Sequence, residues 1–165
     1  MAALLGACAA LSEAPVAPGG FELSGRVAVR YDSEALSGRI FWRHSDDQEE
    51  LLITSPLGQG LARVTRVRGG FLLVASDGKK YRAADAESLT EQVLGWRLPL
   101  AGLADWVQGR PSPGRPSDTL GDTGRELQQD GWLVAYEEFR GGHPLRLRLT
   151  REGLEIRLIV DQWKN

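Results

Sequence analysis

Residues 21–30 alternate between apolar and polar side chains, which is the pattern of a β-strand with one buried face. The same alternation returns in short segments separated by turn residues such as Asp77-Gly78. Short links favour antiparallel pairing of consecutive strands, so this half of the chain is predicted to form a meander. The further strands expected here are residues 36–43, 49–54, 61–68, 71–75 and 79–82.

The middle of the chain changes to a helical period. Asp85 is suited to cap a helix over residues 86–94, and Gly95 is suited to end it. A second helix is expected over residues 100–107, with Pro99 at its start.

Residues 110–122 are rich in Pro, Gly and Ser and are predicted to form a long loop. After this segment, the alternation of apolar and polar residues that is typical of strands returns. A chain of strands, helices and again strands indicates one curved antiparallel sheet with the helices packed on its concave side. The strands expected after the loop are residues 132–136, 137–139, 145–149 and 154–160.

Composition fits one globular domain. The chain has 165 residues, of which 42% are hydrophobic and 25% are charged, and its net charge is −2. Lys and Arg are scattered among Asp and Glu, which predicts neither a basic face for nucleic acid nor a polybasic patch for anionic lipid. No run approaches the ~18 apolar residues of a membrane-spanning helix.

No arrangement of side chains in the sequence is typical of an enzyme, and no metal site or cofactor is expected. His44 and His143 lack metal-ligand spacing and are predicted to be loop or strand-end residues. There is no Gly-x-Ser-x-Gly motif and no phosphate-binding glycine loop. Adjacent acidic residues point to opposite faces of a strand, so they are predicted to be solvated rather than paired for catalysis. These acidic pairs are Asp46-Asp47, Glu49-Glu50 and Glu137-Glu138.

The N-terminus carries the chain's one cysteine, Cys8, behind small residues in Leu5-Gly6-Ala7. This run resembles a lipobox, in which a signal peptidase cuts before a cysteine that receives a diacylglyceryl group. Residues 1–7 are then a remnant of a signal peptide, and residues 8–20 are the acylated cysteine and a flexible tether. The leader is shorter than the usual apolar stretch of about 7–15 residues behind a basic start. The alternative is an N-terminal segment that contains a cysteine by chance.

The link between the strands at 49–54 and 61–68 has an unusual tip. Pro56 and Gly58 are typical turn residues, but a large apolar side chain, Leu57, lies between them. Either Leu57 folds back onto the domain, or the loop of Pro56, Leu57 and Gly58 protrudes and enters a lipid layer or contacts an acyl chain.

Most of the chain, from about Gly25 to Trp163, resembles the outer-membrane lipoprotein receptor family LolB. The resemblance implies an incomplete antiparallel β-barrel, mainly β, with helices over an apolar cavity. It therefore assigns residues 21–165 to a single lipid-handling half-barrel domain. The segments that carry it are residues 38–42, 51–58, 77–87, 98–109 and 156–163.

The resemblance also implies a function without catalysis. A member of this family accepts lipoproteins from the periplasmic carrier LolA and inserts their acyl chains into the outer membrane. It is lipid-anchored there, through Cys8 in this sequence, and faces the periplasm. Leu57 stands where the family has an exposed leucine and is the first candidate for membrane insertion. The partners expected are lipoprotein cargo, LolA and outer-membrane lipid, with no nucleic acid, and the chain is expected to be a monomer.

Apolar residues on the inward faces of the strands and helices are the candidates for lining the acyl-chain cavity. The same residues would also form a solid core, and the sequence does not separate the two. A lipocalin-like lipoprotein that binds another hydrophobic ligand remains an alternative, as does a structural module with a filled core. The candidates are Val27, Val29, Ile40, Trp42, Ile53, Leu89, Val93, Leu103, Trp106 and Leu158.

Overall fold

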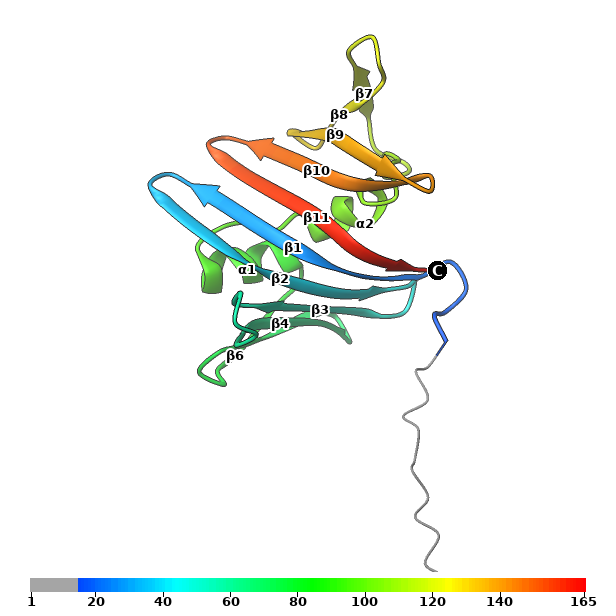
Figure 1. Ribbon diagram of the computed structural model, residues 1–165. Coiled ribbons are helices and arrows are strands. Elements are labelled where there is room, and N and C mark those ends of the chain that lie inside the picture. The colour runs from blue at the N-terminus through cyan, green and yellow to red at the C-terminus, as the bar shows by residue number, and fades with distance from the viewer. Residues whose placement is uncertain (1–14) are drawn as a thin grey trace, which may run out of the picture.

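The computed structural model describes residues 15–165, so Cys8 lies outside the described residues. These residues form one open antiparallel sheet of 11 strands and two short helices (Figure 1). The first half of the sheet is β1 (Phe21–Tyr31), β2 (Glu34–His44), β3 (Glu49–Thr54), β4 (Gly60–Val67), β5 (Gly70–Ala75) and β6 (Lys80–Ala83). The second half is β7 (Ser117–Leu120), β8 (Glu126–Gln129), β9 (Trp132–Arg140), β10 (His143–Arg151) and β11 (Leu154–Lys164).

The two halves of the sheet meet at its centre, where the first strand pairs with the last. The strand order is β6-β5-β4-β3-β2-β1-β11-β10-β9-β8-β7. Each half is a meander of consecutive hairpins, which was predicted for the first half only. In the second half the expected strands 132–136 and 137–139 form the single strand β9. Strand β1 pairs with β11 from Glu22↔Lys164 to Tyr31↔Leu154. The edge strands β6 and β7 lie at opposite ends of this order, so the sheet does not close into a barrel. The predicted fold class, a mainly β incomplete barrel, is confirmed.

Two glycines let the central strands approach their neighbours closely. A Cβ on Gly25 would lie 2.2 Å from the carbonyl oxygen of Ile159, and a Cβ on Gly38 would lie 2.2 Å from that of Thr54. Both contacts are with backbone, which cannot move aside cheaply. The register between β1 and β11 also shifts between Ser24 and Gly25, which bends the sheet at its centre.

The helices α1 (Ala86–Leu94) and α2 (Leu100–Trp106) lie together on one side of the curved sheet, as Figure 1 shows. Asp85 caps α1 by accepting a hydrogen bond of 2.7 Å from the backbone N–H of Ser88. Gly95 ends the helix with a φ of 81°. Both predicted helices are therefore confirmed, including the capping residues of the first.

The predicted loop over residues 110–122 is partly wrong, because it contains strand β7. Strand β8, which pairs with it, was not predicted either. The residues of β7 are Ser117-Asp118-Thr119-Leu120, and most of them are exposed. A short hairpin with both faces near solvent lacks the alternation that identifies a half-buried strand.

Candidate functional site

The residues proposed to line an acyl-chain cavity come together between the sheet and the helices. They belong to strands β1, β2, β3 and β11 and to both helices, and all of them lie in the buried core or, in the case of Val93, pack against it. Leu89 and Trp106 are fully buried, at 0% exposure. Nine of the ten candidates are 5% exposed or less, so the side chains proposed to contact an acyl chain are covered in this conformation.

The pair of helices is joined by a polar contact that the sequence analysis missed. Thr90, at 0% exposure, accepts a hydrogen bond of 2.9 Å from the backbone N–H of Leu98 and donates one of 3.0 Å to the carbonyl of Glu87. This contact links α1 to the segment that enters α2. Within α2, a Cβ on Gly102 would lie 2.5 Å from the Trp106 ring, so a glycine is required beneath the indole.

Strand β9 places two polar groups in the interior without partners. Among residues 15–165, neither the indole N–H of Trp132 nor the hydroxyl of Tyr136 has a hydrogen-bond partner. Burial raises the pKa of the Tyr136 hydroxyl, which keeps it protonated and able to donate. Unpartnered donors in an apolar interior could bond carbonyl oxygens of an entering ligand. The alternation of apolar residues over 132–136 predicted the strand but not this role.

Glu49 is not solvated, which corrects the prediction for the acidic pair Glu49-Glu50. Its side chain is 3% exposed, accepts a hydrogen bond from Trp42 Nε1, and lies 2.8 Å from Nδ1 of His44. A guanidinium nitrogen of Arg66 lies 3.6 Å from the same carboxylate. The neighbouring Glu50 points outward, so only one member of the pair is buried, and His44 at the strand end is confirmed.

Phe21 packs edge-to-face against Trp42 of this polar cluster and stacks on Trp163. Its ring lies 5.0 Å from that of Trp42 and 4.9 Å from that of Trp163, and the Trp163 ring lies 4.7 Å from His143. His143 begins β10, as predicted for a strand-end residue. These rings close the core at the end of the sheet where the tether enters.

The loop with Leu57 protrudes. Ser55 fixes the loop, since its N–H donates to the carbonyl of Gln59 at 2.7 Å and its carbonyl accepts from the N–H of Gly58 at 2.9 Å. Gly58 has a φ of 89°, a conformation that favours glycine. The Leu57 side chain at the tip is 98% exposed, so it does not fold back onto the domain.

The Leu57 loop and the root of the tether lie at opposite ends of the sheet. The pairs Phe21↔His44 and His44↔Glu49 place the start of β1 beside the start of β3, whereas the loop follows Thr54 at the other end of β3. Figure 1 shows residues 15–20 leading into β1 beside the C-terminus, away from the β1–β2 hairpin.

Within residues 15–165 no group of His, Cys, Asp and Glu is arranged to hold a metal ion. None of the described helices is long and apolar enough to cross a membrane.

Comparison with known proteins gives consistent matches. The family profile described as outer membrane lipoprotein LolB matches residues 19–163. An outer-membrane lipoprotein LolB from Thiobacillus denitrificans is 41% identical, with 98% of this chain and 92% of the relative covered. One from Chromobacterium violaceum is 39% identical, with 99% and 95% covered.

Among solved structures, the crystal structure of a DUF1329 family protein from Desulfovibrio piger matches with a TM-score of 0.50. Its sequence is 11% identical, and the match covers 89% of this chain and 84% of that one. This likeness is one of fold alone.

Proposed function

The chain belongs to the outer-membrane lipoprotein LolB family and is an outer-membrane lipoprotein receptor, and we propose that it accepts lipoproteins from the periplasmic carrier LolA and inserts their acyl chains into the outer membrane. The family is one of lipoprotein transport and not of enzymes. The alternative of a lipocalin-like protein with another ligand is not favoured by these relatives.

The energetics of the cargo explain why such a receptor requires an apolar interior. Exposing one CH₂ group to water costs about 0.8 kcal/mol, so an acyl chain of roughly sixteen carbons costs on the order of 10 kcal/mol. Transfer from one apolar cavity to another, and then to lipid, leaves this large contribution almost unchanged. Small differences in affinity then set the direction, and this chain needs no nucleotide for its step.

The interior between the sheet and the helices is the proposed place for the acyl chains. Trp42, Leu89 and Trp106 would contact them there, after α1 and α2 move outward. The unpartnered donors of Trp132 and Tyr136 support this placement, because an acylated cargo carries ester and amide carbonyls that accept hydrogen bonds.

The observation that carries the insertion step is the exposure of Leu57. A large apolar side chain at 98% exposure on a tight, hydrogen-bonded loop is an unfavourable arrangement in water. Entry into the acyl region of a leaflet would bury it, a gain of about 1.5–3 kcal/mol.

We propose further that Cys8 is acylated and holds the domain at the periplasmic face of the outer membrane. The length of the tether is compatible with Leu57 reaching the same leaflet. Residues 9–20, if fully extended, span about 40 Å. The strand β1, which separates the root of the tether from the Leu57 end, has 11 residues and is roughly 35 Å long.

The test is transfer of a purified lipoprotein from its LolA complex to liposomes. Leu57→Glu should still take cargo from LolA, because the substitution lies on an exposed loop outside the core. Its insertion of cargo into liposomes should be slower by about 10- to 100-fold, which corresponds to the lost apolar contact.

Leu57→Met is the matched control, since it keeps an apolar side chain of similar size, and it should insert cargo at nearly the parent rate. Insertion by Leu57→Glu at the parent rate would show that the loop does not act at the membrane.

A further inference from the structure

A groove on the outer face of the sheet lies beside the Leu57 loop. It has a volume of about 380 Å³, and Pro56, which precedes Leu57, forms part of its wall. Its floor is made of small and apolar residues, including Ala28 and Ile159. Three arginines and no carboxylate line it: Arg26, Arg39 and Arg157.

The strand registers place these arginines against other arginines. Arg26 in β1 lies directly opposite Arg39 in β2, and Arg157 in β11 lies directly opposite Arg148 in β10. Like charges in such cross-strand positions destabilise a sheet. The sequence had predicted no basic patch, because arginines that are scattered along the chain become neighbours only when β1 pairs with β2 and β11.

Part of this charge is neutralised within the domain. Arg26 lies 2.8 Å from Asp161, and Arg157 lies 2.8 Å from Glu155. Arg39 makes no ion pair with any residue in the part of the chain that the structure describes, and the same holds there for Arg30, further along the same face of β1. Arg30 lies directly opposite Glu155 in β11, but that carboxylate is paired with Arg157. Arg39 is therefore the clearest uncompensated positive charge at the Leu57 end of the outer face.

We propose that this groove binds the headgroup phosphate of an anionic phospholipid in the target leaflet, with Arg39 as its main contact and Arg30, which lines the adjoining hollow, as a second basic residue. The proposal rests on the function proposed for Leu57. A leucine inserted into the acyl region would bring Pro56, and with it the groove, to the level of the headgroups. Guanidinium groups bind phosphate oxygens in a bidentate manner, so the groove would orient the receptor as its loop enters the leaflet.

Binding to vesicles tests the proposal, with the full chain carrying Cys8→Ala so that a lipid anchor makes no contribution. The parent should bind vesicles of phosphatidylcholine with phosphatidylglycerol more tightly than vesicles of phosphatidylcholine alone, and salt should weaken the difference. The double variant Arg30→Gln/Arg39→Gln should lose this preference, by about fivefold for each charge removed.

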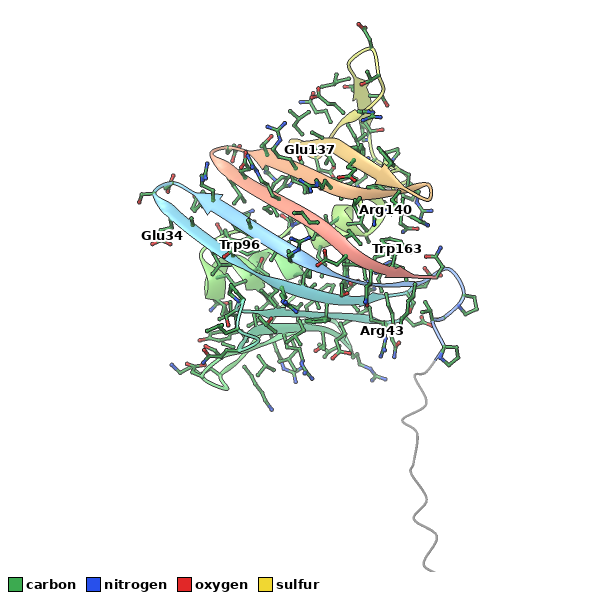
Figure 2. The ribbon with its side chains drawn as sticks, viewed as in Figure 1. Glu34, Arg43, Trp96, Glu137, Arg140 and Trp163 are labelled. Atoms are coloured by element: carbon green, nitrogen blue, oxygen red, sulfur yellow. The ribbon has the colours of Figure 1, made fainter. Side chains whose placement is uncertain are left out.

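Arg140→Gln is the matched control. Arg140 is exposed at the other end of the sheet, near Trp163 (Figure 2), so its loss should leave the lipid preference almost intact. The midpoint of unfolding distinguishes a role of Arg39 in lipid binding from a role in the stability of the domain. Arg39→Gln removes a like-charge pair, so the midpoint should stay the same or rise, whereas a structural role for Arg39 would lower it.

The outcomes for the two sites are distinguishable. If the double variant keeps the preference for phosphatidylglycerol, or if Arg140→Gln loses it equally, the phosphate site is wrong. A parent protein with no preference for phosphatidylglycerol would also overturn the phosphate site and would favour an acidic protein surface as the occupant of the groove.

Leu57→Glu should weaken binding to both kinds of vesicle. If it does not, insertion by Leu57 is wrong, while loss of preference in the arginine variant would still support the phosphate contact.

Discussion

Trp106 in α2 donates its indole N–H to the side-chain oxygen of Gln129 in β8, at 2.9 Å, and both side chains are buried. The same oxygen accepts the backbone N–H of Ser112 at 2.8 Å, and the amide nitrogen of Gln129 donates to the carbonyl of Ser112 at 3.0 Å. The side chain of Gln129 therefore links α2, and the segment that follows it, to strand β8 by hydrogen bonds.

Gln129→Met should lower the free energy of unfolding by about 1–3 kcal/mol, because it leaves the buried N–H groups of Trp106 and Ser112 without an acceptor. Denaturant unfolding followed by tryptophan fluorescence measures this loss. Gln128→Met is the control on the exposed face of the same strand and should change stability little. Equal stabilities for the two variants would mean that the hydrogen bonds of Gln129 to Trp106 and Ser112 do not stabilise the domain.

A brominated acyl chain should quench the tryptophan fluorescence if it enters the interior beside α2. Trp106→Phe should remove more of the quenching than Trp163→Phe, because Trp106 lies in the fully buried core and Trp163 lies at its tether end. Titration with the brominated chain, with a non-brominated chain as the blank, gives the measurement. Transfer of cargo without any quenching would place the acyl chain outside the interior.

Asp85→Ala should cost about 0.5–2 kcal/mol at neutral pH through loss of the cap of α1, whereas Asp85→Asn should retain most of the cap. The backbone N–H of Ser88 is the largest cause that lowers the pKa of Asp85 from its usual 3.8. The contribution of the charged carboxylate is therefore complete above that value and is lost as pH falls through the lower folded-state pKa.

Unfolding curves at several pH values should accordingly show the difference between the parent and Asp85→Ala shrinking at acid pH. A difference that stays constant down to pH values well below the usual pKa would show that the charged cap does not stabilise α1.

Cys8 should be found acylated in cells, with the signal peptide removed before it. Mass spectrometry of the mature N-terminus measures this, and Cys8→Ser should remove the protein from outer-membrane fractions. An unmodified mature N-terminus that contains Cys8 would rule out the anchor.

The sequence by itself determined the features that depend on near neighbours. Alternating side chains located the central strands, Asp85 and Gly95 located the first helix, and Pro56 with Gly58 located the turn that presents Leu57. These signals are local because side-chain direction and backbone conformation repeat over a few residues. The order of whole segments was also enough to indicate the family.

The tertiary structure alone decided which distant residues meet. Pairing of β1 with β11 and β2 placed Arg26 opposite Arg39, and the register of β2 with β3 buried Glu49 between Trp42 and His44. Neither contact has a signal along the chain, because alternation gives the face of a strand but not its partner or register. The full exposure of Leu57 belongs here as well, since only the path of the surrounding chain decides whether an apolar tip is covered.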